Sequence, residues 1–198
     1  MLSRDQLLEP LARRRTDEVV VTTMSVVRAW GKLSDHDLDF ASADSAMAHA
    51  ADLALGIAMA CPRRKVLCLN GDGSMLMSLG TLATVIESGV ENLILFVAVN
   101  RAYEITGRQA IPAATRVDFA AMARAAGFDR VYEFDDPDVY ERDLDEILEA
   151  AGPTFVCVHS EVGEEGPIGR APTEQARYLK VSLAEWSRDM RRALTEGK

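Results

Sequence analysis

A short polar segment follows a strand-like apolar run near the middle of the sequence. The segment reads Asn70-Gly71-Asp72-Gly73-Ser74, follows residues 65–69 and leads directly into a helical pattern. Gly71 and Gly73 allow the backbone to approach a ligand closely, and Asp72 offers a carboxylate. Free N–H groups at the start of the next helix favour phosphate. The segment therefore predicts a phosphate-binding junction, although Gly-Asp-Gly on its own is also typical of a plain turn.

A second oxygen ligand follows the next apolar run. Residues 92–99 form a continuous apolar strand pattern, and Asn100 comes directly after it. If this strand neighbours the strand at 65–69, Asp72 and Asn100 lie side by side at the carboxyl edge of the sheet. A carboxylate, an amide oxygen and a turn carbonyl are the hard ligands that suit Mg²⁺ holding a diphosphate. The spacing therefore predicts a magnesium site.

Strands alternate with helical patterns along the whole chain and must position these residues. We expect strands at 19–22, 65–69, 92–99, 130–134 and 154–159, and helices at 3–15, 25–33, 45–60, 74–88, 119–126, 138–151 and 183–194. Such alternation predicts βαβ units with right-handed crossovers. The expected fold class is α/β, a doubly wound, mostly parallel sheet with helices on both faces, built as a single domain over residues 1–198.

Composition excludes several classes of function. The 198 residues carry 22 basic and 31 acidic side chains, a net charge of −9 that disfavours nucleic acid and anionic membranes as partners. No apolar run approaches the ~20 residues of a membrane helix, and no signal peptide is recognisable. Cys61, Cys68 and Cys157 lie in or beside apolar segments, which favours reduced core residues in a cytoplasmic protein.

Together these motifs resemble a known family. Gly71-Asp72-Gly73-Ser74, followed by Asn100 and Tyr103, is similar to the diphosphate-binding signature of thiamine-diphosphate enzymes. Upstream, Ser45-Ala46-Met47-Ala48-His49 resembles the family's G-S-M-G-H segment. The stretch 100–109 is most similar to sulfopyruvate and phosphonopyruvate decarboxylases, and the resemblance covers residues 41–159.

The resemblance implies a role for each matching residue. The implied cofactor-binding residues are Ser45, Met47, Gly71, Asp72, Gly73, Ser74, Asn100, Ala102 and Tyr103. Asp72 and Asn100 would bind Mg²⁺ through their side chains, and Ala102 through its carbonyl. Met47 would support the thiazolium ring of thiamine diphosphate, with plain core packing as the alternative.

Three further side chains are candidate substrate contacts without a certain catalytic role. His49 either faces the pocket or is a satisfied helix histidine. Arg101 and Arg108 lie after the metal ligand and could pair with a second anionic group of the substrate, or be solvated loop charges. Glu104 and Arg108 depart from the family pattern, because similar decarboxylases carry small residues there.

The resemblance covers only one of the two domains that these enzymes combine. The other, a pyrimidine-binding domain, supplies a glutamate that protonates the cofactor's aminopyrimidine. About 40 residues precede the resemblance, too few for an α/β domain of ordinary size. We therefore expect a β subunit whose partner α subunit brings the pyrimidine-binding domain, in a heterotetramer of two chains of each kind or a multiple.

The implied reaction is thiamine-diphosphate-dependent decarboxylation of a small anionic 2-oxo acid. One alternative keeps the cofactor but joins the product to an acceptor, as in acetolactate-synthase-like or transketolase-like split enzymes. Another is a subunit that keeps the fold for assembly without catalysis.

Overall fold

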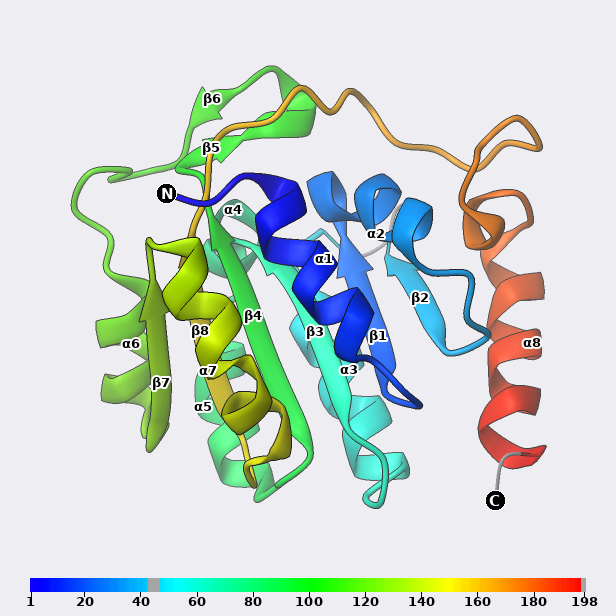
Figure 1. Cartoon of the computed structure of the whole chain (residues 1–198), viewed down its shortest axis with the longest axis horizontal. Coiled ribbons are helices and arrows are strands. Elements are labelled where there is room, and N and C mark those ends of the chain that lie inside the picture. The colour runs from blue at the N-terminus through cyan, green and yellow to red at the C-terminus, as the bar shows by residue number, and fades with distance from the viewer. Residues whose placement is uncertain (43–46, 197–198) are drawn as a thin grey trace.

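The computed structural model describes residues 1–42 and 47–196, and within them a parallel sheet of six strands forms the centre of the molecule (Figure 1). The strand order is β2-β1-β3-β4-β8-β7, and every neighbouring pair in it is parallel. Its strands are β1 (Val19–Thr23), β2 (Asp39–Ser42), β3 (Val66–Gly71), β4 (Leu93–Val99), β7 (Arg130–Phe134) and β8 (Thr154–His159). The expected α/β fold class is confirmed.

Helices cover both faces of this sheet. Helices α1, α2 and α7 lie on one face, and α3, α5 and α6 on the other, while α8 stands beside the edge strand β2 (Figure 1). The helices are α1 (Arg4–Arg14), α2 (Val27–Leu33), α3 (Ala50–Ala60), α4 (Asp72–Met77), α5 (Gly80–Ser88), α6 (Phe119–Ala126), α7 (Pro137–Glu149) and α8 (Leu183–Glu196). Single 3₁₀ turns occupy Met24–Val26, Glu104–Thr106 and Arg177–Leu179. No helix in the described ranges is long and apolar enough to cross a membrane.

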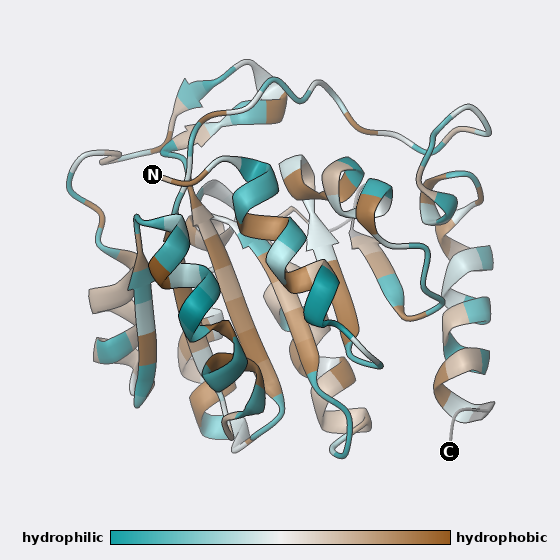
Figure 2. Cartoon of the chain, in the orientation of Figure 1, coloured by the Kyte–Doolittle hydropathy of each residue, from teal (hydrophilic) through white to brown (hydrophobic). Residues whose placement is uncertain are grey.

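The central strands are buried because helices cover both of their sides. In β4 and β8 almost every residue is buried, and β4 is coloured as hydrophobic along most of its length (Figure 2). The exposed faces of α1 and α7 are hydrophilic (Figure 2). Continuous apolar strands between amphipathic helices are expected in a parallel sheet. The single domain over residues 1–198 stays a prediction.

Two predicted helices differ from the structure by more than two residues at an end or by an internal break. The helix expected at 45–60 begins only at Ala50, after a turn at residues 47–49, and residues 43–46 lie outside the described ranges. The helix expected at 74–88 is two helices, because α4 ends at Met77 and α5 begins at Gly80. Ser78 lies at this break and donates its hydroxyl to the carbonyl of Ala48. This hydrogen bond connects the segment after β3 to the turn before α3.

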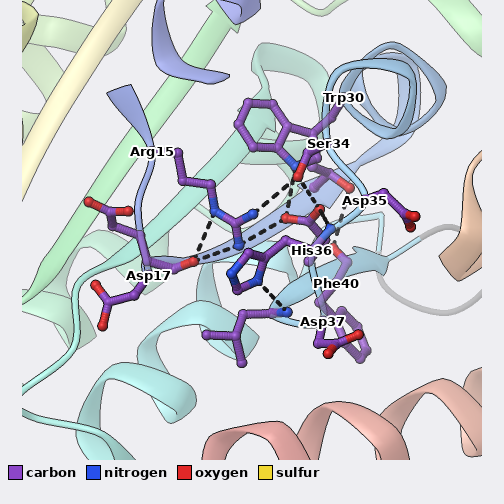
Figure 3. Close-up of polar contacts among 12 residues, drawn as sticks. Arg15, Asp17, Trp30, Ser34, Asp35, His36, Asp37 and Phe40 are labelled. Carbon is purple, nitrogen blue, oxygen red and sulfur yellow. Dashed lines mark hydrogen bonds and ion pairs between the residues drawn. The ribbon is translucent and has the colours of Figure 1, made fainter. Parts of the chain in front are cut away.

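The edge strand β2 was missed by the sequence analysis. Its first residue, Asp39, is fully buried and accepts hydrogen bonds from the Trp30 indole at 3.0 Å and the Ser34 hydroxyl at 2.6 Å. The Arg15 guanidinium lies 3.1 Å from the same carboxylate. Figure 3 shows Arg15, Trp30 and Ser34 converging beside His36. Strand β2 has only four residues and begins with this buried carboxylate, so its sequence carries no clear strand signal although it pairs with β1.

The three cysteines carry free thiols and differ in burial. Cys68 and Cys157 are confirmed as core residues, on β3 and β8, whereas Cys61 is half-buried at the end of α3. Burial raises the pKa of the Cys157 thiol to about 12 and that of Cys68 well above its usual value.

Candidate cofactor and metal site

The candidate site lies at the carboxyl edge of the sheet, where β3 and β4 end side by side. The two strands pair in parallel with Gly71 opposite Ala98, which confirms that they are neighbours. Asp72 follows β3 and Asn100 follows β4, so the pairing brings the two predicted ligands to the same edge. The hairpin of β5 (Ala102–Tyr103) and β6 (Gln109–Ala110) continues from Asn100 above this edge (Figure 1).

The Asp72 carboxylate is buried and held by backbone donors. Its side chain accepts hydrogen bonds from the N–H of Gly73 at 2.7 Å and the N–H of Arg101 at 2.5 Å, and the residue is 2% exposed. Burial raises the pKa of Asp72 to about 6, although the backbone hydrogen bonds act in the opposite direction. A carboxylate in this setting gains from a nearby cation, because the cation offsets the cost of burying its charge.

The Asn100 amide is held at both ends. Its oxygen accepts from the N–H of Ala102 at 3.0 Å, and its NH₂ group donates to Oε2 of Glu104 at 2.9 Å. Arg101 between these residues adopts a left-handed backbone, with φ of 63°, which turns the chain sharply after β4. The turn brings Asn100 and Ala102 together beside Asp72.

These residues line one small hollow. All the predicted cofactor residues in the described ranges line it: Met47, Gly71, Asp72, Gly73, Ser74, Asn100, Ala102 and Tyr103. The hydroxyl of Ser74 donates to the carbonyl of Met47 at 2.7 Å, so the segment after β3 also holds the turn before α3. Ser45, predicted for the same site, lies outside the described residues.

Gly73 is required by the packing of the hollow. A Cβ on Gly73 would lie 2.6 Å from the ring of Tyr103, closer than any side chain tolerates. A Cβ on Gly71 would meet nothing within 4 Å, so the backbone there is open to an approaching group. The oxygen donors of Asp72 and Asn100 beside open backbone fit a divalent cation carrying a diphosphate.

The structure does not bring the candidate substrate contacts into this hollow. His49 is exposed and hydrogen-bonded to Asp52 at 2.6 Å, as expected for a satisfied helix histidine. Arg108 is about half exposed and lies 3.6 Å from Glu164. Arg101 lines a separate hollow on the far side of the β4 end.

Sequence reasoning missed five residues that line the hollow, which are Met24, Ser25, Ala98, Glu104 and Ile105. Met24 and Ser25 line the hollow from the end of β1, and no motif marks them. Glu104, noted only as a departure from the family pattern, is buried and hydrogen-bonded to Asn100. The departure of Glu104 from the family pattern was the one sequence feature that pointed to it.

A scan against protein-family models matches residues 23–158 to the thiamine pyrophosphate enzyme, C-terminal TPP binding domain. The solved structure of a thiamine diphosphate-dependent 4-hydroxybenzoylformate decarboxylase from Rhodococcus jostii RHA1 superimposes with a TM-score of 0.68. It is 19% identical, and the match covers 83% of this chain and 33% of that one, so it supports the fold alone.

Two curated relatives are more similar in sequence. A phosphonopyruvate decarboxylase of Streptomyces viridochromogenes is 36% identical over 180 residues, covering 89% of this chain but 44% of the relative. The chain thus spans less than half the length of that enzyme. The sulfopyruvate decarboxylase subunit beta of Methanothermobacter thermautotrophicus is 32% identical over 159 residues, covering 80% of this chain and 82% of the subunit. With the family model matching most of its length, the chain belongs to the thiamine pyrophosphate enzymes, in the family of their C-terminal TPP-binding domain.

Proposed function

We propose that this chain is the diphosphate- and magnesium-binding β subunit of a split thiamine-diphosphate-dependent 2-oxo acid decarboxylase. The observation that carries the proposal is the pairing of β3 with β4, which brings Asp72 and Asn100 to one edge beside the open backbone of Gly71. The similarity to a separate sulfopyruvate decarboxylase subunit beta over 82% of that subunit supports the division into two chains.

Three residues would hold the metal. Asp72 and Asn100 supply side-chain oxygens, and Ala102 supplies its carbonyl, which together suit Mg²⁺ with diphosphate oxygens and water as the other ligands. The N–H groups of Gly73 and Arg101 hold the Asp72 carboxylate in place before the metal arrives. The site is therefore organised in advance, which lowers the cost of binding.

The rest of the hollow would orient the cofactor. Thiamine diphosphate, when bound, acts as the electron sink for loss of carbon dioxide from a 2-oxo acid. Met47 supports the ring from the turn that Ser74 holds, and Gly73 and Ser74 surround the diphosphate. Substrates are small 2-oxo acids with a second anionic group, in line with the names of the phosphonopyruvate and sulfopyruvate decarboxylases. Arg108, which lies outside the hollow beside Glu164, contacts that second anion where the substrate extends beyond the hollow.

A second polypeptide would complete the active site. An α subunit with the pyrimidine-binding domain supplies the glutamate that protonates the aminopyrimidine. Subunit pairs of this kind form closed symmetric assemblies, so we expect two chains of each kind or a multiple. The free cysteines suit a cytoplasmic location for the assembly.

Calorimetry on the co-purified assembly tests the metal site. Asp72→Ala is expected to abolish Mg²⁺-dependent binding of thiamine diphosphate while the chain stays folded, because the variant removes the charged ligand. Asp129→Ala, which removes an exposed carboxylate just before β7, is the matched control and keeps full affinity. Wild-type affinity in Asp72→Ala contradicts the assignment.

Product analysis tests the reaction. The chain alone is expected to be inactive, and the assembly to release an aldehyde and carbon dioxide from an anionic 2-oxo acid. An acyloin or acetohydroxy acid as the main product would favour carboligation instead. Full turnover by a homogeneous preparation of this chain refutes the division into two subunits.

A further inference from the structure

Glu104 is a buried carboxylate where three segments of the chain meet. The residue is 5% exposed and belongs to the 3₁₀ turn after β5. Its Oε2 accepts from Nη2 of Arg4 at 2.6 Å and from Nδ2 of Asn100 at 2.9 Å. Its Oε1 accepts from the N–H of Glu165 at 3.1 Å. The carboxylate thus joins helix α1, the end of β4 and the segment that follows β8.

The contact with Glu104 fixes, together with the N–H of Ala102, which way the Asn100 amide faces. An asparagine side chain carries an oxygen at one end and an NH₂ group at the other, and only the oxygen binds a metal ion. The Glu104 carboxylate accepts from the NH₂ end of this amide, at 2.9 Å. Glu104 therefore leaves the Asn100 oxygen on the side where it accepts from Ala102.

Arg4 supplies the charge that a buried carboxylate needs. A buried carboxylate without a cation is strongly destabilised, and the Arg4 side chain, 18% exposed, forms the ion pair at 2.6 Å. The segment after β8 covers this ion pair. A Cβ on Gly163 would lie 2.7 Å from both Arg4 Nη2 and Glu104 Oε1, so glycine is needed where the chain passes. The ion pair is therefore enclosed rather than a loose surface contact.

We infer that Glu104 is a positioning residue for the metal ligand Asn100, and that Arg4 of helix α1 holds the Glu104 carboxylate in the orientation that accepts from Asn100. This inference rests on the proposed function, because it assigns to Glu104 the orientation of an amide that binds Mg²⁺. It also gives α1, far from the motif in sequence, a part in cofactor binding. Residues that hydrogen-bond to metal ligands commonly change metal affinity by about 10- to 100-fold when they are replaced.

The first experiment compares single variants in the co-purified assembly. Glu104→Ala is expected to weaken Mg²⁺-dependent thiamine diphosphate binding by about 10- to 100-fold in calorimetry. Arg4→Ala is also expected to weaken Mg²⁺-dependent binding of thiamine diphosphate. Arg13→Ala is the matched control, because Arg13 lies on the same helix and pairs with Glu141 at 2.8 Å, remote from the site. The control is expected to bind as the wild type does.

The second experiment separates orientation from folding. In Glu104→Ala, adding Asn100→Asp gives a ligand with two equivalent oxygens, which needs no orientation, so at least about tenfold of the lost affinity is expected to return. With Glu104 present, Asn100→Asp replaces an amide that donates to Glu104 at 2.9 Å by a second carboxylate. The two carboxylates repel each other, so the affinity for thiamine diphosphate with Mg²⁺ is expected to fall. A merely structural Glu104 predicts no such rescue.

The outcomes are distinct. Wild-type affinity in Glu104→Ala overturns the inference, as does a loss of affinity that Asn100→Asp fails to restore. A wild-type assembly that binds no thiamine diphosphate with Mg²⁺ overturns the proposed function and, with it, this inference. Loss in Glu104→Ala with recovery in the double variant supports the positioning role.

Discussion

The buried carboxyl of Asp72 is expected to make the stability of the cofactor-free chain depend on pH. Burial raises its pKa from 3.8 to about 6. Between these values the native chain holds a proton that the unfolded chain has released, so the free energy of unfolding falls as pH rises. The contribution is fully present below the unfolded-state pKa and is lost as pH rises through the folded-state pKa. Asp72→Asn removes this titration.

The size of the effect follows from the two pKa values. One pKa unit corresponds to about 1.36 kcal/mol, so the whole shift is worth about 3 kcal/mol. Between pH 4.5 and pH 7.5, a single group with these pKa values loses about 2 kcal/mol. The amide also disturbs the hydrogen bonds from Gly73 and Arg101. That cost is independent of pH and cancels when the wild-type-minus-variant difference is compared at the two pH values.

Urea unfolding of the isolated chain without cofactor or Mg²⁺ measures this difference. The wild type is expected to lose about 2 kcal/mol relative to Asp72→Asn between pH 4.5 and pH 7.5. Asp129→Asn, which removes an exposed carboxylate, is the matched control. A difference between the wild type and Asp72→Asn that stays constant between pH 4.5 and pH 7.5 refutes the reasoning that burial controls this carboxyl.

Three further predictions test single contacts. Gly73→Ala is expected to lower the free energy of unfolding by about 1–3 kcal/mol in urea, because the new Cβ clashes with Tyr103. Gly71→Ala is expected to stay close to the wild type. Equal effects of the two substitutions contradict the packing argument. Asn100→Ala is expected to weaken Mg²⁺-dependent cofactor binding less than Asp72→Ala in calorimetry, because a neutral ligand is lost; the reverse order contradicts it. Arg108→Ala is expected to lower kcat/KM for an anionic 2-oxo acid about ten- to a hundred-fold with cofactor affinity kept. Wild-type kinetics in this variant would mean that Arg108 only forms a surface ion pair with Glu164.

Where local sequence signals were strong, the sequence predicted elements to the residue. Helix α6 begins and ends as expected, because Asp118 caps it through the N–H of Ala121 and Gly127 ends it with φ of 107°. Strands β7 and β8 also match their predicted bounds. The two predicted metal ligands met because parallel neighbouring strands bring their carboxyl ends to one edge. These features depend on local caps and on the order of the strands.

The features that the sequence did not predict depend on contacts between distant segments. Strand β2 is held by Trp30 and Arg15 around Asp39, and these partners lie outside the strand itself. The break between α4 and α5 coincides with a hydrogen bond from Ser78 to residue 48. The burial of Glu104 depends on Arg4, a hundred positions away. Short-range periodicity carries no information about such partners.

The unequal burial of the three thiols makes selective chemical labelling possible. Burial raises the pKa of Cys157 to about 12, so its thiol reacts slowly near neutral pH. Cys68 is fully buried, which leaves half-buried Cys61 as the thiol that a maleimide dye reaches first. Cys61 follows α3 and lies shortly before β3 begins, whereas Asp72 follows the end of β3. A dye there can follow the docking of a second chain by fluorescence anisotropy while the cofactor edge stays unmodified.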